Sequence, residues 1–445
     1  NYLAGQLVTN AFTVGLDAQG EFRLYTVAQS HFAVDIAGYY APPGMGGLYY
    51  HPLPKPIRLY DTRAAIPGFA ACEYLNQPVP ANGQLNKTAF VNNCGGVTIP
   101  NDAKAIVGNA TVILPNGNGF TTIFPDGQAV PPVSNLNYLA GEVLTNGFNV
   151  GLDAQGEFRL FSIALAHYAV DIAGYYSPTL NDINGTGLLY YPLNTPLRLF
   201  DTRAPIPGFN PCEYLNAPIA ANAELLKNSH LTCQAQTIPG TAQAIVGNTT
   251  VIQPLAAGFA TMFPDGQARP PVSNLNYLGG QIITNAVTVS LNAQGRFRLF
   301  TVAQAHYAVD VTGYFGTPPA NAPPLAEAGT DQTIQLPESA NLLGTVTDDG
   351  LPGGSLTAAW SKLSGPGTVT FAYANQAATT ATFSATGVYV LRLTGDDSQL
   401  TSMDDVTVTV TDPLLVNAGA DQVVSLPNSA MLMGSVMGGA PPAVT

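Results

Sequence analysis

Apolar and polar residues alternate along short stretches throughout this chain, which is the pattern of a β-strand with one buried face. The stretches Phe32–Ile36 and Val406–Val410 both follow this period of two. Turn signals separate such stretches at short intervals, as at the Asp-Gly pairs 126–127 and 265–266. The pattern therefore predicts an all-β protein whose strands form sandwich-like or barrel-like domains.

The alternating stretches return at fixed offsets, so the chain is built from internal repeats. Residues 1–40 are matched by residues 137–176 and again by residues 276–315, at offsets of 136 and 139. A second block, RLYDTRAAIPGFAACEYLN from Arg58, is matched by RLFDTRAPIPGFNPCEYLN from Arg198. One repeat unit therefore spans about 138 residues, from the RLxDTR block to a closing GYY or GYF.

A different module follows the repeats. The stretch AEAGTDQTIQLP at 326–337 is matched by VNAGADQVVSLP at 416–427. We therefore predict the back half of a repeat unit, two complete units, a Pro-rich linker, a domain of a second type and the start of another copy of it. In chain order these six segments are 1–44, 45–180, 181–318, 319–325, 326–413 and 414–445.

Both terminal segments are expected to be incomplete domains. Half of a β domain exposes an unpaired sheet edge and an unfilled core. We expect residues 1–44 to form a partial sheet with an open edge, completed either by a longer repetitive polypeptide or by strands from a neighbouring chain. A head-to-tail contact of this kind does not close on itself and propagates as a fibre.

Two resemblances follow from these motifs. The unit with the RLxDTR opening, SNLNY middle and VDxxGYF ending resembles a tandem repeat of secreted and cell-surface bacterial proteins, over about residues 1–316. Residues 326–412 resemble a PKD-type immunoglobulin-like domain, through AGxDQ, Trp360 in AAWSKLSGPG, the stretch ATGVYVLRLTGDD and the closing DVTVTVTD. The first resemblance implies an extracytoplasmic surface role. PKD modules are spacers and adhesion or matrix domains in surface proteins and secreted hydrolases.

Composition excludes two classes of partner. Only 10% of residues are charged, against roughly 25% in an average soluble protein. The net charge is −13 with only 15 Lys and Arg, which excludes binding to nucleic acid through phosphate contacts. No apolar run approaches the ~20 residues of a membrane-spanning helix.

The four cysteines carry the clearest chemistry. Cys72 and Cys94 lie 22 residues apart, and Cys212 and Cys233 lie 21 apart at the matching places of the next unit. This spacing predicts one disulfide in each unit and an oxidising compartment. The alternatives are free thiols or a metal site, and zinc is disfavoured because no CxxC pair occurs and no histidine recurs beside the cysteines.

A histidine and an aspartate four residues apart recur in every copy of the repeat. On one strand, about 13 Å separates such residues, too far for a catalytic base and its orienting carboxylate. We expect each aspartate to bind strand-end amides or to pair with an arginine of RLxDTR, whose fork fits a carboxylate. No GxSxG, HExxH or Walker motif occurs, so we expect no enzyme. The repeated pairs are His31 and Asp35, His167 and Asp171, His306 and Asp310; the structural ion pairs expected around them include Arg58, Asp61, Arg63, Arg198, Asp201 and Arg203.

Acidic residues gather in the PKD-like region and make calcium the one cofactor that we consider. Calcium takes six to eight oxygen ligands, and some PKD-like modules bind it at a domain edge. The alternative is turn chemistry, because aspartates followed by glycine form turns without any metal. The candidate calcium ligands are Asp331, Asp348, Asp349, Asp396, Asp397, Asp404 and Asp405.

These observations lead to a non-catalytic structural protein, secreted or on the bacterial cell surface, that self-associates into a filament, sheath or surface layer. A first alternative is an adhesin for surface glycans or other surface proteins, because aromatic rings can stack on sugars. A second alternative is the accessory region of a secreted hydrolase. The tyrosines at the unit borders, which can instead pack between neighbouring units, are Tyr39, Tyr40, Tyr49, Tyr50, Tyr175, Tyr176, Tyr190 and Tyr191.

Overall fold

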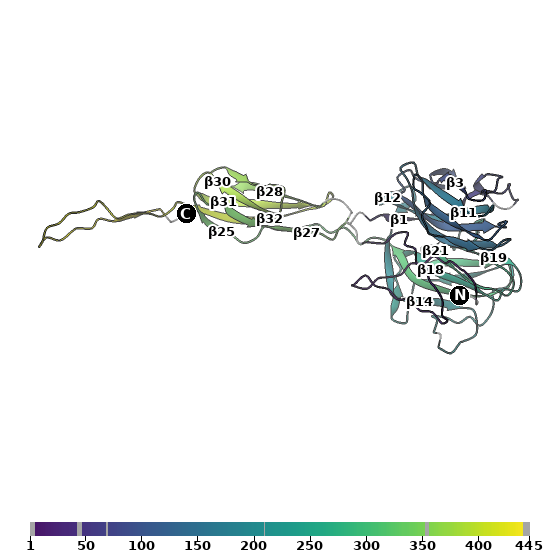
Figure 1. Cartoon of the computed structure of the whole chain (residues 1–445). Coiled ribbons are helices and arrows are strands. Elements are labelled where there is room, and N and C mark those ends of the chain that lie inside the picture. The colour runs from purple at the N-terminus through teal and green to yellow at the C-terminus, as the bar shows by residue number, and fades with distance from the viewer. Residues whose placement is uncertain (1–4, 42–46, 68–69, 209, 352–355, 439–445) are drawn as a thin grey trace. The chain divides into compact units, whose positions relative to one another are not determined.

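The computed structural model describes residues 5–41, 47–67, 70–208, 210–351 and 356–438. Within these ranges all regular secondary structure is β, which confirms the all-β fold class (Figure 1). The chain divides into two compact parts. We call residues 1–40 and 48–318 the repeat body, and residues 41–47 and 319–445 the C-terminal body.

The first complete unit of the repeat body is a sandwich of two antiparallel-dominated sheets. One sheet has the strand order β2-β1-β11-β6-β9 and the other the order β3-β10-β7-β8. Buried side chains from both sheets, among them Tyr168, Phe158 and Leu160, form one continuous core. The strands are β1 (Tyr49–Asp61), β2 (Ala71–Tyr74), β3 (Gly83–Thr88), β6 (Ala105–Ile113), β7 (Gly119–Pro125), β8 (Leu136–Tyr138), β9 (Val143–Gly151), β10 (Glu157–Ser162) and β11 (His167–Ser177), with a hairpin of β4 (Val91–Cys94) and β5 (Val97–Ile99).

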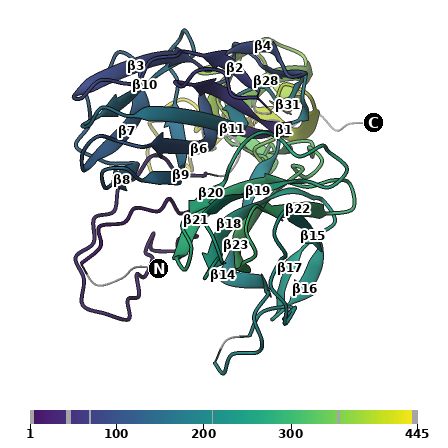
Figure 2. The ribbon, with the colours of Figure 1, turned by 90° about the vertical axis from the view of Figure 1, so that its right-hand side faces the viewer.

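The second unit repeats this sandwich with the sheets β14-β23-β18-β21 and β15-β22-β19-β20. A pair of short strands, β12 (Asn181–Asp182) and β13 (Gly185–Thr186), lies before it. Figure 2 shows the two sandwiches. The strands of the second are β14 (Leu189–Asp201), β15 (Ala223–Asn228), β16 (Leu231–Cys233), β17 (Gln236–Ile238), β18 (Ala242–Ile252), β19 (Gly258–Pro264), β20 (Leu275–Tyr277), β21 (Ile282–Ser290), β22 (Arg296–Thr301) and β23 (His306–Gly316).

Burial along the strands follows the sequence pattern in most places. β10 alternates between half-buried and buried residues, as a strand with one face on the core should. β11 is instead buried at every position after His167, although its sequence also alternates. A strand is buried on both faces only when a second layer covers its outer face. The second unit supplies that layer, since its Ser273 contacts the outward-facing Asp171 of β11.

The N-terminal segment, residues 5–40, does not form the partial sheet that we expected. No strand is assigned within it, and it runs as an irregular chain beside β9 and β21 (Figure 2). In the complete units, each corresponding strand pairs with the front half: β9 with β6, β11 with β1 and β6, and β10 with β3 and β7. The segment lacks ladder hydrogen bonds in this structure because no front half lies beside it.

The C-terminal body contains one complete β-sandwich. Its sheets have the orders β25-β32-β31-β28 and β26-β30-β29, and Trp360 and Tyr389 lie in the core between them. Downstream, two short strands pair as an exposed ladder. The strands are β24 (Leu325–Glu327), β25 (Gln332–Gln335), β26 (Ala340–Leu343), β27 (Thr345–Thr347), β28 (Thr357–Ser364), β29 (Val369–Phe371), β30 (Ala378–Phe383), β31 (Gly387–Asp396), β32 (Thr401–Thr411), β33 (Leu415–Asn417) and β34 (Ser435–Met437).

Candidate functional site

All four cysteines form disulfides within their own units. Cys72 pairs with Cys94 and Cys212 with Cys233, with Cα atoms 5.4 and 5.8 Å apart. In the first unit the bond joins β2 at the sheet edge to the β4–β5 hairpin. Each disulfide therefore anchors a peripheral hairpin to the sandwich, and all four sulfur atoms are used structurally.

The RLxDTR block forms a buried ion-pair network in the first unit. Arg58 on β1 lies opposite Asp171 on β11, and its Nε and Nη2 atoms donate to the two carboxylate oxygens at 2.8 and 3.1 Å. Asp61 accepts hydrogen bonds from Arg58 Nη1 at 3.3 Å and from Arg63 Nε at 2.9 Å. The two-point fork fixes the register of β1 against β11.

The second unit contains the same network. Arg198 donates to both oxygens of Asp310 at 2.8 and 3.1 Å, and Arg203 donates to Asp201 at 3.0 Å. Burial opposes ionisation of Asp61 and Asp201, but the hydrogen bonds and charges of the neighbouring arginines outweigh it and hold the pKa of each carboxyl below its ordinary value. These aspartates are therefore ionised partners of arginine at neutral pH.

Asp35 has a different environment from its two counterparts. Its carboxylate accepts the backbone N–H of Ser134 at 3.4 Å, in the next unit along the chain. Asp171 likewise accepts the N–H of Ser273 at 3.2 Å, in addition to its fork with Arg58. The repeated aspartate thus connects one unit to the next, a contact that sequence reasoning did not find.

The repeated histidines do not join the aspartates in a dyad. The Nδ1 atoms of His167 and His306 lie 2.9 and 3.0 Å from the hydroxyls of Thr62 and Thr202. These threonines are the T of RLxDTR. His31 is exposed. The histidines of the two complete units therefore hold β11 and β23 to the end of the neighbouring strand.

Three matched asparagines form a closed ring between the repeats, which we call the asparagine ring. The N–H of Ala11 donates to Asn146 Oδ1 at 3.2 Å, and the N–H of Gly147 donates to Asn285 Oδ1 at 2.9 Å. The N–H of Ala286 closes the cycle at Asn10 Oδ1, at 3.0 Å. The sequence signal is the TN pair that recurs at the matched positions, which sequence reasoning passed over. The three copies of the back half are therefore related by a local threefold axis.

A cluster of aromatic rings surrounds the same axis. Tyr40 stacks on Tyr190 with ring centroids 4.4 Å apart, and Tyr50 packs on Phe315 at 4.1 Å. The hydroxyls of Tyr40 and Tyr176 lie 2.7 Å apart. Burial raises the pKa of Tyr190 to about 12, so this hydroxyl stays neutral at physiological pH. These border tyrosines therefore pack between units, the second of the two roles considered from the sequence.

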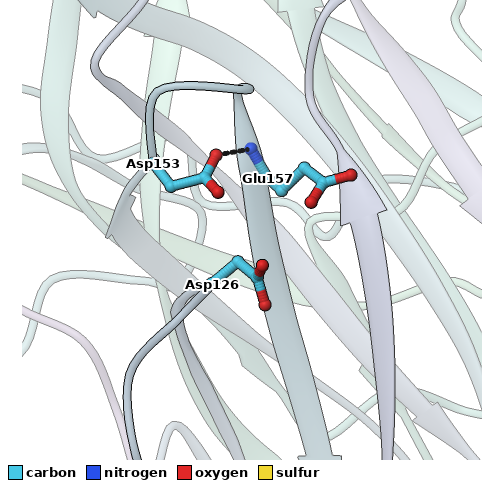
Figure 3. Close-up of side chains that lie close together, drawn as sticks. All are labelled: Asp126, Asp153 and Glu157. Carbon is cyan, nitrogen blue, oxygen red and sulfur yellow. Dashed lines mark hydrogen bonds between the residues drawn. The ribbon is translucent and has the colours of Figure 1, made fainter.

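Three acidic side chains, Asp126, Asp153 and Glu157, lie together in the first unit with oxygens within 4.8 Å of one another (Figure 3). Sequence reasoning did not select them. Asp153 Oδ1 accepts the N–H groups of Gln155 and Glu157 at 2.9 and 2.7 Å, and Asp126 pairs with Arg159. The matching residues of the second unit are Asp265, Asn292 and Arg296, so the cluster is no property of the repeat. We assign it to turn formation.

Four of the seven candidate calcium ligands are engaged in holding the PKD-like sandwich together. Asp331 accepts the N–H of Thr407, and Asp404 accepts the N–H of Ala328, at 2.8 and 2.7 Å. Asp405 forms a fork with Arg392. Asp396 accepts the N–H of Ser398, in a turn.

The other three candidates, Asp348, Asp349 and Asp397, lie at one end of the sandwich beside the linker. Asn321 Nδ2 donates to Asp397 at 3.0 Å, and the N–H of Ala322 donates to Asp349 at 3.1 Å. Two buried oxygens here, Asn321 Oδ1 and Asp348 Oδ1, have no hydrogen-bond partner within the described structure. Unpartnered buried oxygens of this kind are the feature that a cation would satisfy.

Comparison with known proteins identifies the second module. Residues 328–410 match a family of PKD domains. The solution structure of the PKD domain from the KIAA 1837 protein is similar at 28% sequence identity, covering 24% of this chain and 100% of that one, with a TM-score of 0.17. The sandwich of the C-terminal body is thus a PKD domain, as the AGxDQ and DVTVTVTD motifs indicated.

Two further solved structures are similar over a larger share of the chain. Drosophila N-cadherin EC1-3 is 11% identical and covers 66% of this chain and 89% of its own, with a TM-score of 0.17. The M60 catalytic domain of Clostridium perfringens ZmpB with two CBM51 domains is 12% identical and covers 75% and 42%, with a TM-score of 0.14. Superpositions this poor carry no argument about function.

The PKD domain and the two disulfides are consistent with an extracellular protein. Within the described residues, no helix has the length and apolarity to cross a membrane. The resemblance of residues 1–316 to repeats of bacterial surface proteins stays a prediction.

Proposed function

We propose that this chain is a non-catalytic structural protein of the bacterial cell exterior, a subunit or segment of a filament, sheath or surface layer. The observation that carries the proposal is the contact between repeat units. Matched residues of successive copies bind one another through the asparagine ring and the aromatic cluster. Since these residues belong to the repeat itself, each added copy brings the same contacts with it.

The roles of the other repeated polar residues support this function. The arginines of RLxDTR hold aspartates, and two of the histidines hold threonines. A group committed to a structural partner is a poor acid or base, because catalysis needs a free and suitably tuned group. The disulfides support a location in an oxidising compartment outside the cytoplasm.

Electron microscopy of native cell-surface material, with an antibody against the repeat body, tests the proposal. We expect label along regular assemblies, and purified chain that associates with itself as concentration rises in analytical ultracentrifugation. A chain that stays monomeric at high concentration and labels no ordered structure contradicts a structural role. Hydrolytic activity of the purified chain contradicts the non-catalytic part.

The adhesin alternative has less support because most border tyrosines are covered. Tyr50, Tyr175 and Tyr176 are buried, whereas Tyr39 is 85% exposed. A sugar-stacking role therefore falls to Tyr39 among these residues. Binding on a glycan array that is lost in Tyr39→Ala, but kept in a matched Tyr373→Ala variant of the PKD domain, would favour an adhesin.

For the PKD domain we propose a calcium ion held by Asn321, Asp348, Asp349 and Asp397. The two unpartnered oxygens and the linker contacts described above support this site. Calcium bound there would link residues 321–322 to the domain edge and stabilise the domain by mass action. The hydrogen-bonding roles of the other four aspartates leave them outside this proposal.

Differential scanning calorimetry with calcium or with EGTA tests this site. We expect calcium, more than magnesium at the same concentration, to raise the midpoint of the PKD transition. Asp348→Asn should abolish the calcium response. Asp405→Asn, which alters an ion pair elsewhere in the domain, should retain it. A calcium response that is equal in both variants places the ion elsewhere.

A further inference from the structure

The repeat body contains a threefold arrangement in which one set of contacts is incomplete. The asparagine ring closes because it needs only back halves, and all three back halves are present. Other contacts need a front half, the part of a unit that corresponds to residues 45–136. Each of these occurs twice around the axis, and the third occurrence lacks its partner among the described residues.

The side-chain amides of the ring show the gap clearly. Asn285 Nδ2 donates to Asn109 Oδ1 at 3.1 Å, and Asn10 Nδ2 donates to the matched Asn248 Oδ1 at 2.9 Å. The third bond of this set would run from Asn146 to the same asparagine of a third front half. Within the part of the chain that the structure describes, Asn146 Nδ2 instead makes only the bond inside its own unit, to the carbonyl of Asn135.

The aromatic cluster has the same gap. Tyr50 packs on Phe315, and the matched Tyr190 packs on Tyr40. Tyr176 is the residue that matches Tyr40 and Phe315 in the first unit. The threefold relation places another front-half tyrosine on Tyr176, from the direction in which the N-terminal segment lies.

Differences in exposure point to the same missing layer. The side chain of Asp171 is 2% exposed because Ser273 of the next unit covers it, whereas the matched Asp310 is 28% exposed. Their arginine partners differ likewise, with Arg58 at 4% and Arg198 at 23%. β23 accordingly alternates in burial where β11 is buried throughout.

The N-terminal segment carries a core face that nothing in the described structure covers. Phe22, Leu24 and Ile36 are 43%, 50% and 83% exposed. Their counterparts in the first unit, Phe158, Leu160 and Ile172, are completely buried between the two halves of the sandwich. Large apolar patches on a soluble protein mark sites of association.

We infer that residues 5–40 and the exposed face of β23 together form a docking surface for a front half-unit of this same repeat. The occupant has the pattern of residues 45–136 and is joined directly ahead of residue 1. Residue 1 matches residue 137, which follows the front half of the first unit without a break. A covalently joined front half also binds at a high effective concentration. With this layer in place the repeat body becomes a closed ring of three sandwiches.

A chain extended by a second copy of residues 45–136 ahead of Asn1 tests the inference by hydrogen exchange and mass spectrometry. In the original chain we expect amides of residues 7–15, 21–26 and 32–38 to exchange fast. In the extended chain they should exchange at least about 100-fold more slowly, as amides of core strands do. The extended chain should also remain monomeric by light scattering and bind less of a hydrophobic dye.

A matched control carries Gly108→Val in the added copy only. A Cβ atom at this glycine would collide with a backbone carbonyl of the partner strand, Asp171 in the first unit and Asp35 in the new one. This control should leave residues 7–15 and 32–38 in fast exchange, with the two original sandwiches still protected.

Three outcomes would overturn the inference. The first is fast exchange of residues 7–15 and 32–38 in the extended chain. The second is slow exchange of the same residues in the original monomer, which would mean that the segment already has its partner. The third is protection in the original chain that rises with concentration together with a dimeric mass, which would make the occupant a second copy of this chain.

Discussion

Arg58–Asp171 and Arg198–Asp310 have the same hydrogen bonds but different surroundings. The first pair is buried by the neighbouring unit, and the second is about one quarter exposed. Removing one partner of a buried ion pair leaves the other charge unpaired in a poorly solvated place, which costs about 3–5 kcal/mol, whereas exposed pairs contribute about 0–1 kcal/mol.

We therefore expect Asp171→Asn to lower the melting temperature of the repeat body more than Asp310→Asn does. Differential scanning calorimetry of the two variants and the parent chain at pH 7 measures the difference. Each variant is the control for the other, because the substitution and the local contacts are the same. Equal shifts would show that the covering unit does not affect the pair.

The depressed pKa of Asp61 predicts acid sensitivity with a defined sign. A carboxyl whose pKa is lower in the folded state stabilises the fold above its unfolded pKa, about 3.9. This contribution is lost as the pH falls from there through the folded value. The direction of the shift places the loss below about pH 4.

Asp61→Asn should accordingly destabilise the repeat body at pH 7 and make less difference in acid. We expect the gap in melting temperature between this variant and the parent chain to narrow from pH 5 to pH 2. Thermal unfolding followed by circular dichroism across this range measures it. A gap that stays constant with pH would mean that the charge of Asp61 does not stabilise the fold.

At the scale of elements, one glycine in each unit sets how closely two strands approach. Gly247 on β18 lies against β23 at a register shift, where a Cβ atom would collide with the carbonyl oxygen of Asp310. The backbone there is not in the left-handed region, so the close approach alone requires glycine. Gly240, just before β18, has open space around its Cα.

Gly247→Ala should destabilise the second unit by about 1–3 kcal/mol, the usual cost of overpacking, while Gly240→Ala should change little. Denaturation by guanidinium chloride, followed by tyrosine fluorescence, compares the two variants. If both variants unfold at the parent midpoint, the strands can separate to admit a methyl group at little cost.

At the scale of the whole molecule, the two bodies differ in their covalent links. Both disulfides lie in the repeat body, and the C-terminal body has none. A disulfide that closes a loop of about 20 residues contributes roughly 3 kcal/mol in the chain-entropy model. The bodies have separate cores, so each should unfold as its own transition.

We expect two calorimetric transitions, of which a reducing agent lowers only that of the repeat body. A truncated chain is not needed, because the PKD transition in the same scan is the internal control. Peptide mapping without reduction should recover the links Cys72–Cys94 and Cys212–Cys233. A shift of both transitions on reduction would mean that the bodies unfold together.

The residues themselves determined the β-rich fold, the repeat boundaries and the partners of the cysteines. These features depend on short periods and fixed offsets, which can be read without knowing where distant segments meet. The PKD motifs, from AGxDQ to DVTVTVTD, were legible for the same reason. The fork between RLxDTR and the repeated aspartate was also foreseeable, because a buried arginine needs a carboxylate and the same two residue types recur in both complete units.

Only the tertiary structure decided how the copies meet. Asn10, Asn146 and Asn285 look like ordinary strand residues until a threefold arrangement brings them together from positions more than 130 residues apart. Strand pairing likewise decided the state of residues 5–40. Their alternation is that of strands, but a strand is stable only beside a partner that takes its backbone hydrogen bonds and covers its apolar face. The sequence pattern specifies which residues need covering, and the packing of other segments decides whether they are covered.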